Sequence, residues 1–155
     1  MRQTISKDIP LAEITLRRYE RPFGLEKREL IRKLCLSIGL LQPGDSRDVI
    51  VDILQTLLES KSGKSSEEIR ESVISLRKKA KLPEKGTAPS NIRRQLKRLK
   101  DLYLIEKVNN SYRITENEDL AVLFEERIEK FYLKNIISRV KEYFKALQEQ
   151  DNHNS

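Results

Sequence analysis

A long helical pattern near the carboxyl end limits the folds open to this chain. From about residue 117 to 148, apolar side chains recur with helical spacing, beginning at Leu120 and continuing to Leu147. Thirty-odd residues at 1.5 Å per residue span roughly 45–50 Å, which is more than the width of a small domain. Such a helix must wrap back over the N-terminal helices or pair with a partner.

Shorter helical patterns precede the long one. Residues 8–20, 25–41 and 46–60 each have the apolar spacing of a helix, and a fourth helix opens where Ser65 and Glu68 form a capping box. The apolar stripe of the third segment is broad, which predicts a central, well-buried helix.

Further signals predict where the third helix and the long helix begin. Asp45 or Ser46 can cap the third helix, and Thr115 with Glu118 repeats the capping-box pattern at the start of the long helix. The polar residues 149–155 after the long helix are expected to be disordered.

The segment SNIRRQLKRLKDL, residues 90–102, is strongly basic. Ile92, Leu96 and Leu99 fall on one stripe of the helix that Pro89 would open. Residues 77–100 hold ten cations and only one acid, Glu84, which is hard to reconcile with a balanced solvated surface. The opposite side of this helix carries Ser90, Arg94, Lys97 and Asp101, and Arg93 and Arg98 flank that side.

Two short strands follow the basic helix. Residues 104–108 and 111–115 have the composition of strands, and only Asn109 and Asn110 separate them. Because asparagine tolerates the positive φ that a type I′ turn requires, the sequence predicts a tight hairpin.

The chain offers little for catalysis or metal binding. Cys35 is the single cysteine and lies in an apolar run, and His153 is the single histidine and lies in the tail. Gly63-Lys64-Ser65 resembles the end of a phosphate-binding loop, but Leu58 stands where that motif needs its first glycine. We therefore predict no enzyme, no cofactor and no metal site.

The amino-terminal segment MRQTISKDIP lacks the apolar run of a signal peptide, and no stretch approaches the length of a membrane span. We expect a cytoplasmic protein without a membrane partner. The formal net charge of +7 favours an anionic partner.

The order helix, helix, basic helix and hairpin is that of a winged helix-turn-helix. The run SNIRRQLKRLKDLYLIEKVNNSYRIT resembles the recognition helix and wing of transcriptional regulators of that superfamily, with a polar start, spaced leucines and a hairpin that ends in Thr115. The resemblance implies a mostly α fold with a small β-hairpin. It also implies four parts: an N-terminal helical extension at 1–45, a winged-helix DNA-binding domain at 46–115, a long C-terminal helix at 116–148 and the tail.

The chain departs from this superfamily in two places. Tyr103 follows the basic helix where such regulators usually have glycine, so a bulky residue must accept or avoid a left-handed conformation. The connection at residues 81–88 is also longer than the family's tight turn, which affects the angle between the two helices it joins.

The resemblance implies DNA contacts from three places, and each place has a structural explanation as well. The basic helix could simply be a solvated face, cations at the end of the fourth helix suit its dipole, and the asparagine pair makes the turn. The expected contacts are Ser90, Asn91, Arg93, Arg94, Lys97 and Arg98 in the helix, Lys107, Asn109, Asn110 and Arg113 in the hairpin, and Lys78, Lys79 and Lys81 at the end of the fourth helix with Lys85 following. Arg77 is a further basic residue at that helix end.

Regulators of this type commonly dimerise through a long terminal helix, so the resemblance also implies a homodimer. The expected contact residues are Phe131, Ile136, Val140, Phe144 and Leu147. We predict a sequence-specific, double-stranded DNA-binding protein, a dimeric transcriptional regulator. A winged-helix module that binds an acidic protein surface in a transcription or replication assembly is the alternative, and RNA binding is a lesser one, because interleaved aromatic residues are lacking.

Overall fold

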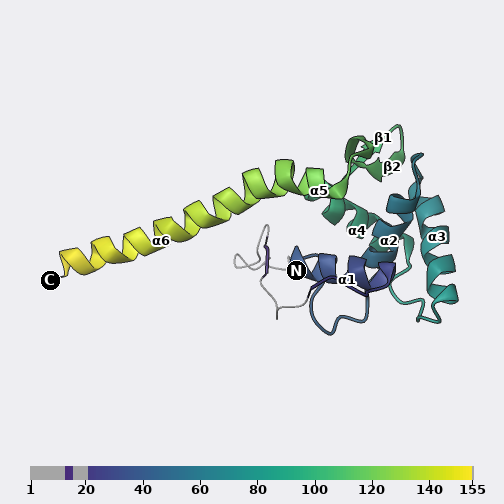
Figure 1. The fold of residues 1–155 in the computed structure, drawn as a ribbon, viewed down its shortest axis with the longest axis horizontal. Helices are drawn as coiled ribbons and strands as arrows, with labels where there is room; N and C mark the ends of the chain where they lie inside the picture. Colours follow the sequence, from purple (N-terminus) through teal and green to yellow (C-terminus); the bar gives the residue numbers. More distant parts are fainter. Residues whose placement is uncertain (1–12, 16–20, 155) are drawn as a thin grey trace, which may run out of the picture.

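The computed structural model describes residues 13–15 and 21–154 and confirms a mostly α fold with a two-stranded antiparallel hairpin (Figure 1). The arrangement is compatible with a winged helix. Its elements are α1 (Lys27–Ser37), α2 (Val49–Glu59), α3 (Ser66–Lys79), α4 (Pro89–Asp101), β1 (Ile105–Val108), β2 (Ser111–Ile114), α5 (Leu120–Leu123), a π-helical segment (Phe124–Leu133) and α6 (Lys134–His153).

Helix α2 is the centre of the core, as its broad apolar stripe predicts. It packs against α1, α3 and α4, and its side chains Ile50, Ile53, Leu54 and Leu57 are almost fully buried. Fully burying an aliphatic side chain of this size stabilises the fold by about 1.5–3 kcal/mol relative to leaving it exposed.

The capping box at the start of α3 is confirmed. The Glu68 amide donates to Ser65 Oγ at 3.2 Å, and the Ser65 amide donates to Glu68 Oε1 at 3.0 Å. The prediction that Asp45 or Ser46 caps α2 is wrong, because that helix begins only at Val49. Asp45 instead closes a local turn, since its Oδ1 accepts a hydrogen bond from the Arg47 amide at 3.0 Å.

Tyr103 accepts the left-handed conformation, with φ of 61°, although its side chain is bulky. Its amide donates to Lys100 O at 2.9 Å, and the Leu104 amide donates to Leu99 O at 3.2 Å. These two bonds form a Schellman motif, which satisfies carbonyls at the end of α4. The C-cap therefore keeps its usual geometry although the residue in it has a bulky side chain.

The hairpin has the predicted two-residue turn, with positive φ at both Asn109 and Asn110. A third piece of backbone, which the sequence did not indicate, joins it. The Lys64 amide donates to Tyr112 O at 3.0 Å, and the Tyr112 amide donates to Lys64 O at 2.7 Å. A side chain on Gly63 would place its Cβ only 2.6 Å from Ser111 Cβ, so this close approach requires glycine.

Most of the helix expected at residues 8–20 lies outside the described residues. The three that are described, 13–15, are not helical. Thr15 lies beside the end of α1 instead, where its amide donates to Ser37 O at 3.0 Å and its Oγ1 donates to Leu36 O at 3.2 Å.

The C-terminal helix differs from its prediction at both ends. Thr115 forms no capping box, because its Oγ1 donates to Tyr103 O at 2.8 Å and the helix opens only after Asp119. At the other end α6 continues through residues 149–153, which were expected to be disordered. In Figure 1 this helix projects away from the rest of the molecule. Among the described residues, none of the helices combines the length and apolar content that a bilayer crossing requires.

Candidate nucleic-acid interface

Helix α4 has the two faces that its sequence predicts. Ile92, Leu96 and Leu99 are buried at 0–1% exposure, and Pro89 occupies the first turn. The outward face carries Ser90, Arg93, Arg94 and Lys97, all of them exposed.

Asn91 organises the amino-terminal half of α4. Its Nδ2 donates to Gly86 O at 2.7 Å, which ties the helix to the preceding loop. Its Oδ1 accepts from Arg94 Nη2 at 2.7 Å and from Gln95 Nε2 at 3.1 Å. Asn91 is therefore half-buried and engaged on both ends of its amide, and it acts on Arg94 by holding that guanidinium in place.

Lys97 and Asp101 form an exposed ion pair one turn apart, with 2.9 Å between Nζ and Oδ2. Exposed pairs of this kind contribute only about 0.3–0.5 kcal/mol, so the lysine can exchange this carboxylate for another anion at little cost.

The structure does not bring Arg98 to the outward face of α4. Arg98 is half-buried, donates to Gln95 Oε1 at 2.8 Å and lies 3.4 Å from Gly39 O at the end of α1. It also lies near Cys35, where burial raises the pKa of the thiol to about 12 although the charge of Arg98 opposes the rise. Its place on the edge of the helix turns it toward α1, so it adds less to the outward face than Arg93 and Arg94 do, and its contact with DNA stays a prediction.

The hairpin presents less free positive charge than its sequence suggests. Arg113 pairs with Glu106 across the strands, with 2.7 Å between Nη2 and Oε1. The Glu116 amide also donates to this carboxylate, and together with Arg113 it holds the pKa of Glu106 below its usual value. Lys107 lies with its Nζ 5.4 Å from the centre of the Tyr112 ring, and Asn109 and Asn110 form the exposed tip.

The lysines at the end of α3 and in the loop after it form a separate patch. Lys78, Lys79, Lys81 and Lys85 are all exposed, and Lys78 lies 3.7 Å from Glu84. Helix α3 begins beside the hairpin, next to Lys64, and its 14 residues span about 20 Å. Figure 1 shows its carboxyl end and the following loop at the end away from the hairpin. The structure therefore does not bring these lysines together with the hairpin.

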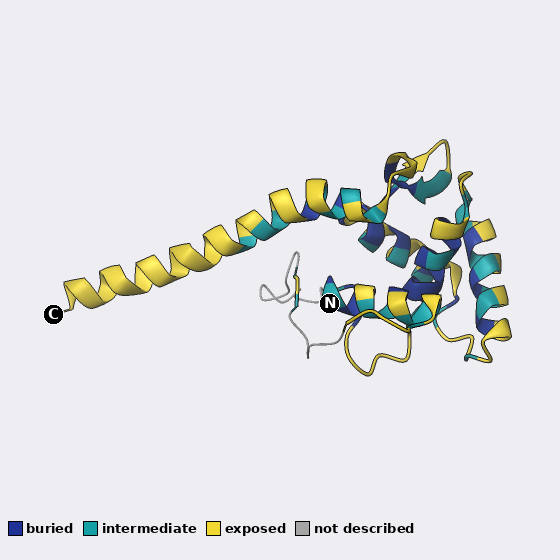
Figure 2. Ribbon diagram, in the orientation of Figure 1, coloured by how far each residue is buried: buried dark blue, intermediate teal, exposed yellow. Residues whose placement is uncertain are grey.

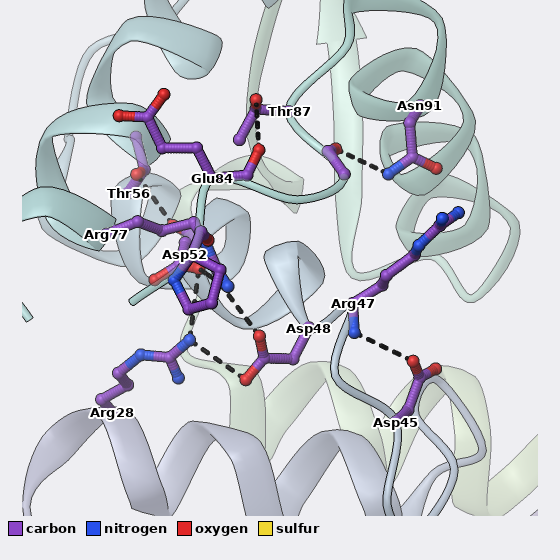
Figure 3. A network of polar contacts seen from close by, with 12 residues as sticks. Arg28, Asp45, Arg47, Asp48, Asp52, Thr56, Arg77, Glu84, Thr87 and Asn91 are labelled. Atoms are coloured by element: carbon purple, nitrogen blue, oxygen red, sulfur yellow. Dashed lines mark hydrogen bonds and ion pairs between the residues drawn. The ribbon is translucent and has the colours of Figure 1, made fainter. Parts of the chain in front are cut away.

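Arg77, the first cation of that group, has a structural role instead. Only 1% of its side chain is exposed, and its Nη1 lies 2.8 Å from Asp52 Oδ2 and 2.9 Å from Asp48 Oδ1 (Figure 3). Arg28 of α1 joins the same two carboxylates at 3.2 and 3.3 Å. Burial raises the pKa of Asp52, although the hydrogen bond from Arg77 opposes the rise.

This buried cluster also positions the loop before α4. Arg77 Nε donates to Pro83 O at 2.6 Å, and Arg70 Nε of the same helix donates to Thr87 O at 2.7 Å. Sequence reasoning missed the cluster, although one signal was present: Asp52 stands inside the apolar stripe of α2, and a buried carboxylate needs a cationic partner.

Two further basic residues near the hairpin were also missed. Lys61 and Lys64 precede α3, and the backbone pairing of Lys64 with Tyr112 brings this turn against β2. Their separation from the hairpin in sequence concealed this, and only the small residue Gly63 between them hinted at a close approach.

The residues expected at a dimer contact lie along the C-terminal helix and remain uncovered (Figure 2). The exposed fractions are 56% for Phe131, 49% for Val140, 70% for Phe144 and 61% for Leu147, while Ile136 is partly buried.

The described part of the chain contains no group of three or more histidine, cysteine, aspartate or glutamate side chains arranged to hold a metal ion. Comparison with known proteins gives no further identification: no family model, no curated protein and no solved structure matches this chain.

Proposed function

We propose that the protein binds double-stranded DNA sequence-specifically, with α4 in the major groove and the hairpin beside it, and that it acts as a dimeric transcriptional regulator. The observation that carries the proposal is the outward face of α4. Arg93, Arg94 and Lys97 are exposed there, opposite a buried apolar stripe. A helix of this width fits the major groove, where arginine pairs bidentately with guanine and lysine neutralises phosphate.

Arg94 is the best candidate for reading a base. The hydrogen bond from its Nη2 to Asn91 restricts the guanidinium before any target arrives, which lowers the entropy cost of binding. Lys97 is better suited to phosphate, because binding a phosphate would cost it only the weak, exposed ion pair with Asp101.

The hairpin would add Lys107 and the two asparagines at its tip. Arg113 would contribute less, because Glu106 already compensates its charge at 2.7 Å. The lysines at the end of α3 and in the loop after it would contact DNA only if the duplex continued past α4, away from the hairpin.

A second candidate is a protein-interaction module that docks an acidic surface. The observation that favours it is the shallow groove between α3 and α4, where Glu67 and Glu71 lie beside Arg93. Carboxylates there would repel the unbroken row of phosphates along a duplex, whereas an acidic protein surface can place its separate carboxylates opposite the exposed cations and away from the two glutamates. We place this candidate second, because the outward face of α4 carries no large exposed apolar side chain among the described residues, as a protein-docking surface usually would.

Binding to labelled random duplex DNA across a salt series tests the proposal. Neutralising about 4–8 phosphates gives a slope of log K against log salt of roughly −4 to −7. The variant Arg94→Ala/Lys97→Ala should bind more weakly, and its slope should be shallower by about 1–2. Selection from a random pool then identifies the preferred site.

The matched control is Lys27→Ala/Arg32→Ala, which removes the same charge from α1, a helix that carries none of the expected DNA contacts. It should leave the slope close to that of the unmodified protein. Equal losses in both variants would mean that net charge alone attracts DNA. Absence of binding by the unmodified protein at low salt would overturn the proposal in favour of an acidic protein partner.

A further inference from the structure

The C-terminal helix ends in an apolar stripe that no described part of the chain covers. All twenty residues of α6 are described, and none of them is buried. Its large apolar side chains Ile137, Val140, Phe144 and Leu147 are 48–70% exposed and keep the 3–4 residue spacing of a helix–helix contact. An exposed apolar stripe of this extent marks an interaction surface.

Charge is segregated along the same helix. Residues 116–129, which lead into it and form its first turns, contain six carboxylates and one arginine. Residues 130–145 contain five cations and one carboxylate, Glu142. The amino-terminal part is therefore strongly acidic and the middle part strongly basic, although the two nearly cancel in the net charge of the segment.

An apolar groove lies at the base of this helix. Its volume is about 530 Å³, and Leu120, the first residue of α5, forms part of its wall. The other apolar walls come from α1, the segment before it and the end of α2, and they include Leu25, Leu30, Leu34 and Leu58. Leu30 is 42% exposed and Leu34 and Leu58 are each 37% exposed, which is unusual for leucines that surround one cavity.

We propose that two copies of the chain pair through this helix in antiparallel orientation, and that the last turns of each helix enter the apolar groove at the base of the other. The proposal rests on the dimer of the proposed function and specifies its geometry. Leu120 and Leu147 are separated by 27 residues, or about 40 Å of helix. An antiparallel pair that overlaps over this length brings Leu147 and Phe144 of one copy to the groove beside Leu120 of its partner.

Electrostatics distinguishes the two orientations. In the antiparallel register with Leu120 beside Leu147 of the partner, the acidic residues 116–129 of one copy lie opposite residues 138–151 of the other, which contain three cations and three carboxylates. The basic residues 130–145 lie opposite residues 122–137, which also contain three of each, so this orientation does not bring like charges together. A parallel pair places acid beside acid and base beside base, which is destabilising. The antiparallel pair also covers the groove, whereas a parallel pair leaves both grooves open.

Cross-linking of cysteine variants tests the arrangement in the full-length protein. Leu30→Cys places a thiol in the groove, and Leu147→Cys places one near the end of α6. With a short bismaleimide, neither variant alone should form a covalent dimer, because the identical thiols would lie about 40 Å apart. A mixture that has exchanged subunits should form one. Cys35 is fully buried, and the unmodified protein serves as the control for any background it gives.

Val140→Cys supplies the opposite readout. In the antiparallel arrangement its two copies lie about 20 Å apart along the helix axes and should not cross-link, whereas in a parallel pair they face each other. The proposal would be overturned if Val140→Cys formed a covalent dimer and the mixture of Leu30→Cys with Leu147→Cys formed none.

Sedimentation of the unmodified protein separates this proposal from that for DNA binding. If the protein remains a monomer at concentrations up to about 100 μM, about 100-fold above a micromolar dissociation constant, the antiparallel pair is overturned. The proposal for DNA binding would then still be tested by its own salt series. A stable antiparallel dimer that fails to bind DNA would instead retain this inference and reject the function.

Discussion

Helices α2 and α6 of this chain are stabilised in contrasting ways. Of the eleven residues of α2, eight are buried, including the carboxylate Asp52. Helix α6 is almost twice as long, and none of its residues is buried. Tertiary packing therefore holds α2, whereas α6 within one chain depends on intrinsic helix propensity, which is a weak source of stability. The difference separates a part of the molecule that packs completely within one copy from a part that leaves its apolar side chains exposed.

The largest effect is expected at the buried ion cluster of Arg28, Asp48, Asp52 and Arg77. Arg77→Ala should lower the free energy of unfolding by about 3–5 kcal/mol, because it leaves Asp52 buried without its closest cation. Urea denaturation followed by circular dichroism measures the change. Lys78→Ala, the adjacent exposed position, should change the stability by less than about 0.5 kcal/mol. Similar losses in both variants would show that Arg77 is not the buried partner of Asp52.

A pair of aliphatic truncations compares the two helices directly. Leu57→Ala in α2 should cost about 2–5 kcal/mol, because Leu57 is 1% exposed and its removal leaves a cavity. Val140→Ala in α6 should change the stability of the monomer by less than about 0.5 kcal/mol. It should instead raise the concentration at which the dimer dissociates, which sedimentation measures. A large loss of monomer stability in Val140→Ala would mean that α6 packs on its own chain.

The smallest effect is expected in the hairpin and depends on pH. Hydrogen bonds from the Glu116 amide and Arg113 lower the pKa of Glu106 below its usual value near 4.5. Its ionised form therefore stabilises the fold above pH 4.5, and this contribution is lost as the pH falls through the lowered pKa. The stability difference between the unmodified protein and Glu106→Gln should be less than about 1 kcal/mol at pH 7. It should shrink toward zero between pH 5 and 3, and a difference that does not depend on pH would contradict the assignment.

Signals carried by neighbouring residues predicted local structure well. The Asn109-Asn110 turn and the Ser65–Glu68 capping box were confirmed, because each depends on bonds within a few residues. The same capping pattern at Thr115 failed, because a tertiary acceptor, Tyr103 O, takes its hydroxyl. A local capping pattern therefore predicts a hydrogen bond that a side chain can form, and that bond forms only where no tertiary acceptor takes the same hydroxyl.

Long-range contacts account for what the sequence did not reveal. Arg77 was counted with the surface cations because a helix end rich in lysine suits the helix dipole. Its burial follows from Asp48 and Asp52, which are 25 or more residues away. Helical spacing placed Arg98 on the flank of the outward face, and it could not show that Gly39, 59 residues earlier, offers this side chain a carbonyl oxygen. The outward positions Arg93, Arg94 and Lys97 were predicted well, because only the local amphipathic pattern determines them.

The backbone pairing between Lys64 and Tyr112 limits how far the hairpin can tilt. Rotating the hairpin away from the body would break both hydrogen bonds and separate Ser111 from Gly63, which it closely contacts. The distance between the hairpin and α4 is therefore nearly constant. If α4 lies in a groove of a duplex, this fixed distance makes groove width a property that the protein selects, even at base pairs that no side chain touches.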